Sequence, residues 1–206
     1  MGNNLDLQEI QITEPEEIEI QGLHTVRMEL GIIGTRPLQV HRQPYLEKGK
    51  KQPEYTDREA FEASMYYFSD GRHGFPAKAI KACAVNAGRF LPTKMTEIRG
   101  MFFVEAEEDG LVEILNPIDP GLPPVPEMKK GMIKTKQGTS IPYVRAMYPE
   151  WKIRFFITYV KEFAELAIIM QTIQVGGLFI GLGARRPERS GNNDYGTFIP
   201  ETAMEV

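Results

Sequence analysis

The sequence predicts an α+β fold in which two helices cover one face of an antiparallel sheet. Alternating apolar residues predict one strand near the start of the chain and another in its second half. Each is followed, after a gap, by a segment with helical spacing and then by further strand-forming residues. This order is strand, helix, strand, strand, helix, strand, with one extra hairpin. It is typical of the split βαβ or ferredoxin-like arrangement.

The first half of the chain supplies a strand, a long insertion and a helix. Apolar residues alternate with charged ones over 24–33, which predicts a half-buried strand. Residues 41–73 are partly basic and broken by prolines, so we expect a long insertion there. Pro76 suits the first turn of a helix, and the good helix formers over 77–87 predict that helix. Pro92 marks its end.

The middle of the chain predicts a hairpin and a projecting segment. The apolar runs 101–106 and 111–115 are joined by an Asp-Gly pair, a strong signal for a hairpin turn. Residues 116–142 begin with several prolines and continue with lysines around two glycines. We expect this second insertion to form a protruding finger with a basic tip.

The last third predicts two strands, a helix and a closing strand. Strands are expected around 143–147 and over 152–159, where apolar and other residues alternate. The apolar segment 162–174 predicts the second helix, and Gly176 and Gly177 are expected to stop it. A last strand is expected over 195–199.

The length of 206 residues suits one main domain. We expect a single ferredoxin-like domain over 21–206, with insertions at about 41–73 and 116–142, behind an acidic arm over 1–20. The arm contains six carboxylates and no lysine or arginine, the reverse of the basic start of a signal peptide. No apolar run reaches the ~18 residues that span a membrane. The single cysteine, Cys83, excludes an internal disulfide and fits a reducing cytoplasm.

Charge alone argues weakly against a nucleic-acid ligand, because the formal net charge is −4. The acidic arm accounts for this sign, and the rest of the chain carries a net charge of +2. Its basic residues also cluster, so a basic groove is compatible with the acidic average.

A loop with five glycines and three arginines, residues 176–191, is the clearest candidate site. Glycine lets a ligand approach the backbone closely, and arginine offers a planar fork of donors that suits phosphate. The loop follows a helix and lacks the Rossmann and Walker patterns. It therefore predicts either a polyanion-binding loop or a plain glycine-rich connection with solvated arginines. The predicted phosphate contacts are Gly181, Gly183, Arg185, Arg186 and Arg189.

Two further basic groups extend this prediction. Lys78 and Lys81 lie at the start of the first helix, where a positive helix end can add to their charge. The finger lysines can follow a phosphate backbone; they are Lys129, Lys130, Lys134 and Lys136. Nearby aromatic residues, such as Phe75, Tyr143 and Tyr148, are candidates to stack on unpaired bases. Alternatively, the lysines are ordinary solvated side chains and the aromatic residues belong to the core.

The sequence contains no clear catalytic or metal signature. His24, His41 and His73 lie far apart and show no metal-ligand spacing. The sequence also lacks hydrolase motifs. We therefore expect no catalytic residue, no metal and no cofactor. A histidine acting as general base in a metal-independent endoribonuclease is an open alternative.

Three short segments resemble the RAMP superfamily, the ferredoxin-like proteins of CRISPR effector complexes. They are Gly34-Thr35-Arg36-Pro37-Leu38, the helix opening at 75–82, and Gly-Leu-Gly-Ala-Arg-Arg at 181–186 followed by Tyr-Gly-Thr-Phe at 195–198. The branch it resembles is the backbone subunit that repeats along a guide RNA. The resemblance implies that basic residues of the first helix and the glycine-rich loop contact RNA. It also implies that a finger reaches a neighbouring subunit.

The resemblance has departures. Ala77 and Ala79 stand where the family usually has a small hydroxyl-bearing pair, and the loop is longer than usual. The compact length and these motifs also resemble bacteriophage proteins, which suggests a bacterial or phage-infected host cell.

Together these observations predict non-catalytic binding of single-stranded nucleic acid, with RNA favoured. The chain is expected to assemble as a homo-oligomer or within a multisubunit complex along the strand, without membrane contact. The alternative is a protein–protein assembly component, either a phage structural protein or an inhibitor of a host defence complex. The endoribonuclease is the second alternative.

Overall fold

The computed structural model describes residues 22–42, 55–134, 138, 140–190, 193–201 and 204–205. For Ile133, Lys134, Ser190, Met204 and Glu205 it describes the backbone alone. The predicted arm over 1–20 and Lys136 at the finger tip lie outside the described residues. Among the described helices, none is long and apolar enough to cross a lipid bilayer.

The main sheet is antiparallel and has the strand order β10-β1-β9-β6-β4-β3, with β5 added on β9 and β11 on β1. The strands are β1 (Thr25–Gly34), β3 (Tyr66–Tyr67), β4 (His73–Pro76), β5 (Phe102–Val104), β6 (Leu111–Leu115), β9 (Lys152–Val160), β10 (Phe198–Pro200) and β11 (Met204–Glu205). The central pair, β1 and β9, is in register from Thr25 opposite Val160 to Ile33 opposite Lys152.

The connections through two helices establish the predicted ferredoxin-like plan. Helix α2 (Ala77–Ala87) lies in the connection from β1 to β5 and β6, and β9 lies between these strands in the sheet. Helix α4 (Leu166–Val175) lies in the connection from β9 to β10, with β1 between them. Each βαβ unit is therefore split by one inserted strand, as the order of elements predicts.

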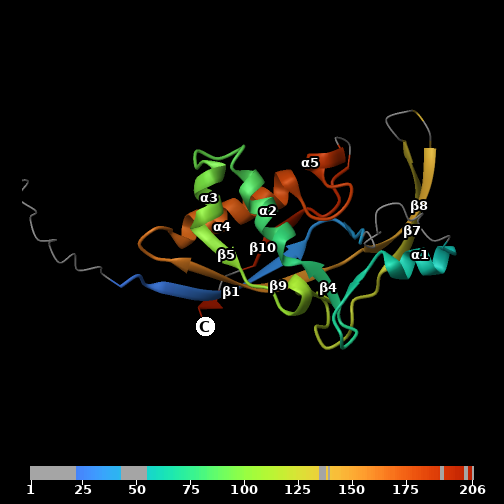
Figure 1. Cartoon of the computed structure of the whole chain (residues 1–206), viewed down its shortest axis with the longest axis horizontal. Helices are drawn as coiled ribbons and strands as arrows, with labels where there is room; N and C mark the ends of the chain where they lie inside the picture. Colours follow the sequence, from blue (N-terminus) through green and yellow to red (C-terminus); the bar gives the residue numbers. More distant parts are fainter. Residues whose placement is uncertain are drawn as a thin grey trace, which may run out of the picture.

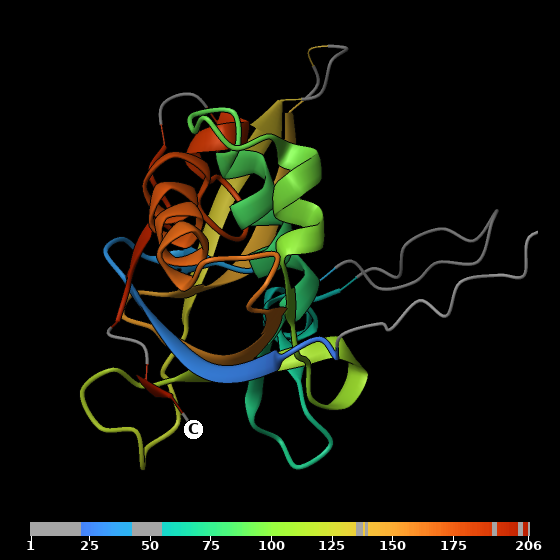
Figure 2. The same cartoon turned by 90° about the vertical axis from the view of Figure 1, so that its left-hand side faces the viewer.

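The helices lie on one face of this sheet, as Figure 1 shows for α2, α3 (Met95–Met101), α4 and α5 (Pro187–Ser190). Alternate residues of β1 and β9 point into the layer between sheet and helices, and the side chains of Leu30, Ile32 and Ile153 are almost fully buried there. Ile80 of α2 and Ile169 of α4 meet them in the core. The same layering is visible end-on in Figure 2.

The predicted hairpin of 101–106 with 111–115 is wrong. Strands β5 and β6 do not pair with each other; both pair with β9. Phe102 lies opposite Tyr159, whereas Ile114 lies opposite Ile153, so the two strands follow one another along the same edge of β9. The short 3-10 turn η1 (Glu108–Gly110) separates them. Met101, the first residue of the predicted strand, is instead the last residue of α3, a helix that the sequence analysis missed.

The finger is a β-hairpin that belongs to a second, three-stranded sheet. Strand β7 (Glu127–Lys134) pairs with β8 (Ser140–Tyr148), and β8 also pairs with β2 (Leu38–Gln39). The hairpin rises beside the helical layer in Figure 1. Helix α1 (Asp57–Ala63), from the first insertion, packs against β8, and the hydroxyl of Ser64 accepts a hydrogen bond from the amide of Ala146.

Gly176 and Gly177 do not stop the second helix. The chain continues past α4 as a π-helical turn, η2 (Gly176–Ile180), and leaves the helix at Gly181, whose φ is 71°. A Cβ on Gly177 would lie 2.2 Å from the carbonyl oxygen of Phe198 in β10. The glycine pair therefore permits close packing of η2 on the sheet. The last strand accordingly begins at Phe198, three residues later than predicted.

Replacing Gly177 with alanine tests this packing. Alanine has the higher helix propensity, but its Cβ would collide with the backbone of β10, which cannot move as a flexible side chain could. The collision therefore outweighs the gain in propensity, and the free energy of unfolding should decrease. We expect Gly177→Ala to lower the free energy of unfolding by about 1–3 kcal/mol in urea titrations. Gly100→Ala in α3 is the matched control, because its Cβ would meet no atom within 4 Å. It should stabilise the protein by up to about 1 kcal/mol. Equal gains from both would contradict the packing role.

Candidate nucleic-acid interface

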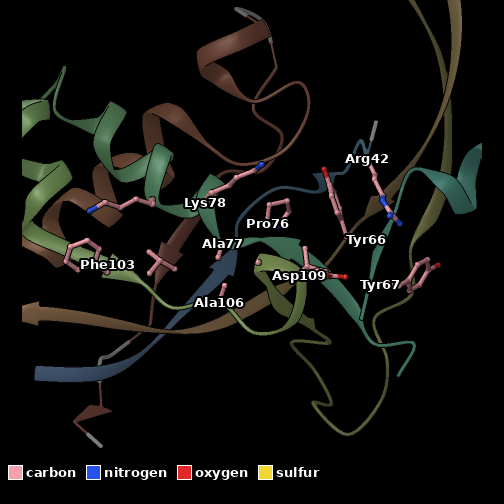
Figure 3. Close-up of a pocket in the computed structure, with 13 residues that line it drawn as sticks. Arg42, Tyr66, Tyr67, Pro76, Ala77, Lys78, Phe103, Ala106 and Asp109 are labelled. Carbon is pink, nitrogen blue, oxygen red and sulfur yellow. The ribbon is translucent and has the colours of Figure 1, made fainter. Parts of the chain in front are cut away.

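A groove runs along the start of α2 and is lined by four of the eleven predicted site residues, Lys78, Lys81, Gly183 and Arg186. It consists of two hollows of about 660 and 360 Å³. Tyr66, Pro76 and Lys78 line both hollows, so these residues form the boundary between them. We call the two together the α2 groove. Figure 3 shows the larger hollow, between the start of α2 and the η1 turn.

Lys78 lies at the centre of the α2 groove. Strand β4 runs directly into α2, and Pro76 is the N-cap residue with extended backbone. The buried side of α2 is formed by Ala77, Ile80 and Ala84, so Lys78 is left facing outward. It is exposed and has no hydrogen bond or ion pair with any described residue. Lys78 therefore presents its charge on an open surface.

Lys81 has a different environment from Lys78, although it also lines the larger hollow. Its amino group donates to the carbonyl oxygen of Ile98 at 2.9 Å and to that of Phe102, and lies 3.7 Å from the centre of the Phe102 ring. Burial lowers its pKa to about 8. These contacts bind the end of α3 to α2 and occupy two of the three N–H donors of Lys81.

The glycine loop is fixed to β2 at one edge of the groove. Gly181 and Gly183 both have a φ of 71°, a backbone conformation that favours glycine. A Cβ on Gly183 would lie 2.4 Å from the carbonyl oxygen of Gln39, and the amide of Ala184 donates to that oxygen at 2.7 Å. Protein backbone therefore already accounts for the close approach at Gly183.

The three arginines of the glycine loop have different environments, although Arg186 and Arg189 share Glu188 as a partner. Arg186 lines the smaller hollow, but it donates to the carbonyl of Gly183 at 2.9 Å and to the carboxylate of Glu188 at 2.9 and 3.2 Å. Arg189 is 73% exposed and lies 4.0 Å from Glu188. Arg185 has a φ of 58° and faces the finger. Arg186 is the one of the three that is held within the groove.

Arg185 and the finger meet on the ring of Tyr143. The guanidinium of Arg185 lies 5.2 Å from the centre of this ring, and that of Arg145 lies 4.6 Å from it. Tyr143 is opposite Gly131 in the hairpin and lies across it, because a Cβ on Gly131 would be 2.6 Å from the tyrosine oxygen. The glycine loop and one face of the finger therefore form a shared cationic surface.

The finger lysines divide between the two faces of the hairpin. Lys129 is opposite Arg145 in the register, so it lies on the face toward the glycine loop. Lys130 points the other way and pairs with Asp57 of α1. The backbone alone is described for Lys134, and Lys136 lies outside the described residues. Of the four predicted lysines, Lys129 therefore lies on the side that faces the glycine loop and Lys130 lies on the side of α1. The side chains of the other two are not described.

Two cations were missed by the sequence analysis. Arg42 lines the larger hollow, is exposed, and follows β2 on the same segment that holds the glycine loop. Arg145 is buried, and its Nε finds no hydrogen-bond partner among the described residues. Burial and the neighbouring Arg185 lower the pKa of Arg145. The signal for Arg42 was weak, because it stood at the start of a predicted insertion.

Two of the aromatic candidates for stacking are wrong. Phe75 is 3% exposed and Tyr148 is fully buried, so neither presents a ring face to a base. Tyr66 and Tyr67 of β3 line the larger hollow instead. They lay inside the predicted insertion, where the sequence analysis expected no regular structure.

The histidines lie in three separate places. His24 is exposed and 2.5 Å from Glu162, His73 is 2.7 Å from the hydroxyl of Tyr148, and His41 lines the smaller hollow beside Lys78. Burial lowers the pKa of both His41 and His73, with Arg145 adding to the effect on His41. Within the described residues, no cluster of three or more histidine, cysteine or acidic side chains could hold a metal ion.

The lowered pKa of His73 predicts a loss of stability in mild acid. Above its ordinary pKa of 6.5 the imidazole is neutral in both states and carries no penalty. As the pH falls below that value, the unfolded chain takes up the proton first, so the free energy of unfolding decreases. Urea titrations at pH 7.5 and 5.5 should show this decrease, and it should be smaller in His73→Gln. An unchanged pH dependence in that variant would refute the assignment.

Comparisons with known proteins bear on the fold. No protein-family model matches the sequence, and no curated protein matches it. Solved structures do match. One is a chain in the cryo-EM structure of the type III-B Cmr-beta bound to cognate target RNA, with 13% identical residues and a TM-score of 0.54. The match covers 88% of this chain and 61% of that one, so this chain spans less than two thirds of its length. At this identity, the similarity shows a common α+β fold.

Proposed function

We propose that this chain is a RAMP-like, non-catalytic subunit that binds single-stranded nucleic acid, with RNA as the favoured ligand. The strand lies in the α2 groove, and copies of the chain assemble side by side along it. The observation that carries this proposal is the convergence of cations from three distant segments on one groove. These are Arg42, Lys78 and Arg186.

The charges in the groove suit a phosphate backbone. Arg42 and Lys78 are exposed and form no ion pair with the described residues, so a phosphate would not have to displace a carboxylate. Arg186 is paired with Glu188, so its guanidinium is fixed at the edge of the groove. Single-stranded nucleic acids are bound by grooves of this kind, in which cations follow the backbone and aromatic rings contact the bases.

The finger supports the assembly part of the proposal. The loop-facing surface formed by Lys129, Tyr143, Arg145 and Arg185 continues the basic character of the groove beyond the main sheet. A hairpin that rises beside the helical layer can reach a strand or a neighbouring copy without rearranging the core (Figure 1). The fold shared with a subunit chain of an RNA-bound complex supports the same proposal.

The contrast between Lys78 and Lys81 gives a direct test. Fluorescence anisotropy with a labelled 12-nucleotide RNA should show binding that weakens with salt, because each neutralised phosphate releases counterions. Lys78→Met should reduce the salt slope of log affinity by about 0.7. Lys81→Met should instead lower the free energy of unfolding, because it removes the contacts between α2 and α3.

Lys161→Met is the matched control, because Lys161 is exposed in the turn after β9 and does not line the groove. It should leave both the slope and the stability unchanged. Salt-independent binding, or equal losses of affinity in all three variants, would refute the proposed groove. A clean oligomer that survives nuclease and binds no strand would favour a protein–protein assembly component.

One observation keeps the endoribonuclease as a second candidate. Of the three histidines, all of which the structure describes, His41 lines the groove, and its lowered pKa leaves it neutral and able to accept a proton at neutral pH. Incubation of a labelled RNA with the wild type and with His41→Ala separates the two readings. Cleavage that the wild type performs and the variant lacks would establish the enzyme; intact RNA in both supports the non-catalytic proposal.

A further inference from the structure

The larger hollow of the α2 groove contains a feature that phosphate binding does not explain. Asp109, in the η1 turn, lines the same hollow as Arg42, Lys78 and Lys81. Its carboxylate forms no hydrogen bond or ion pair with the described residues. A negative charge here opposes a phosphate, so its presence indicates that another part of the ligand meets it.

The position of Asp109 directs the side chain into the groove. Its φ of 55° is unusual for a residue other than glycine, and Gly110 follows with a φ of 74°. In Figure 3 the Asp109 side chain extends from the turn toward the side on which Tyr66, Tyr67 and Arg42 lie. The hollow of about 660 Å³ therefore combines aromatic rings, cations and one free carboxylate. Its volume falls within the ~300–1,000 Å³ of small-molecule sites.

We infer that this hollow takes a single nucleobase of the bound strand, and that Asp109 selects guanine. An ionised carboxylate only accepts hydrogen bonds and offers two oxygens side by side. Guanine presents two adjacent donors, its ring N–H and its amino group, which match both oxygens. Uracil, cytosine and adenine each place an acceptor beside their donor, which the second oxygen would repel. Tyr66 and Tyr67 supply aromatic surface for the base, while Arg42 and Lys78 hold its flanking phosphates.

This inference rests on the proposed function, and its test separates the two. The probes are a labelled 12-nucleotide oligouridine, the same strand with one central guanine, and the same strand with inosine at that place. Anisotropy should show the guanine strand binding about fivefold or more tightly than oligouridine. The inosine strand, which lacks the amino group, should fall between them.

Asp109→Asn should abolish this preference, because the amide presents an N–H where the carboxylate presents an acceptor. Asparagine tolerates the positive φ, and Asp109→Gly is a second variant that suits the same backbone. Glu150→Gln removes the same charge from the exposed turn between β8 and β9 and should leave the preference intact.

The outcomes are distinct. Equal binding of the three strands by the wild type, with Asp109→Asn tightening all of them alike, would overturn the base site and leave the proposed function standing. Failure of every strand to bind would overturn both. A preference that persists in Asp109→Asn and Asp109→Gly would show that another group reads the base and would overturn the role of Asp109.

Discussion

The junction between the glycine loop and β2 is the contact on which the candidate interface depends. The amide of Ala184 donates to the carbonyl of Gln39 at 2.7 Å, and Gly183 passes so close to that carbonyl that no side chain fits. Through β2 this contact joins the finger sheet to the helical layer, so cations from both border one groove. The junction is not built for maximum stability, because the buried side chain of Gln39 has no hydrogen-bond partner among the described residues. Such an unpaired amide costs about 1–3 kcal/mol, and close backbone packing has to outweigh it.

The sequence predictions succeeded where the structure of a segment depends on its own apolar spacing, and they failed where it depends on contacts with distant segments. The α2 helix and the β1 and β9 strands were found almost to the residue, because each buries one face and its apolar spacing records that face. Gly176 and Gly177 were assigned as a helix stop because glycine has a low helix propensity, which is a purely local property. Their actual reason, the carbonyls of Cys83 and Phe198 lying against them, is a contact between distant segments. Similarly, an Asp-Gly turn predicts a hairpin locally, whereas the length of β9 allows both flanking strands to pair along it.

The candidate site was predictable in type but not in detail. Lys78 and Lys81 looked equivalent in the sequence, since both lie at the polar side of an amphipathic helix. The packing of α3 separates them: its terminal carbonyls take up the amino group of Lys81 and leave Lys78 open. Arg42, Tyr66 and Tyr67 could not be placed, because their position depends on how the first insertion returns to the sheet edge through β3. Glycine and arginine content identifies a loop, but the direction of each arginine is set by neighbours such as Glu188 and Tyr143.

The acidic average of the chain is compatible with a basic groove because many described carboxylates are already paired. On the face of the sheet away from the helices, Glu105 accepts from Arg27, while Arg72 holds Asp70, Glu107 and Glu113. These pairs cancel locally and contribute little field at a distance of one Debye length, about 8–10 Å. Arg42 and Lys78 in the α2 groove have no such ion-pair partner among the described residues, and Asp109 is the one acidic residue that lines the groove with them, so their positive field is only partly offset where a strand would lie. Net charge thus records the total, whereas pairing decides where a polyanion is attracted, and in this molecule the unpaired positive charge and the hollow coincide.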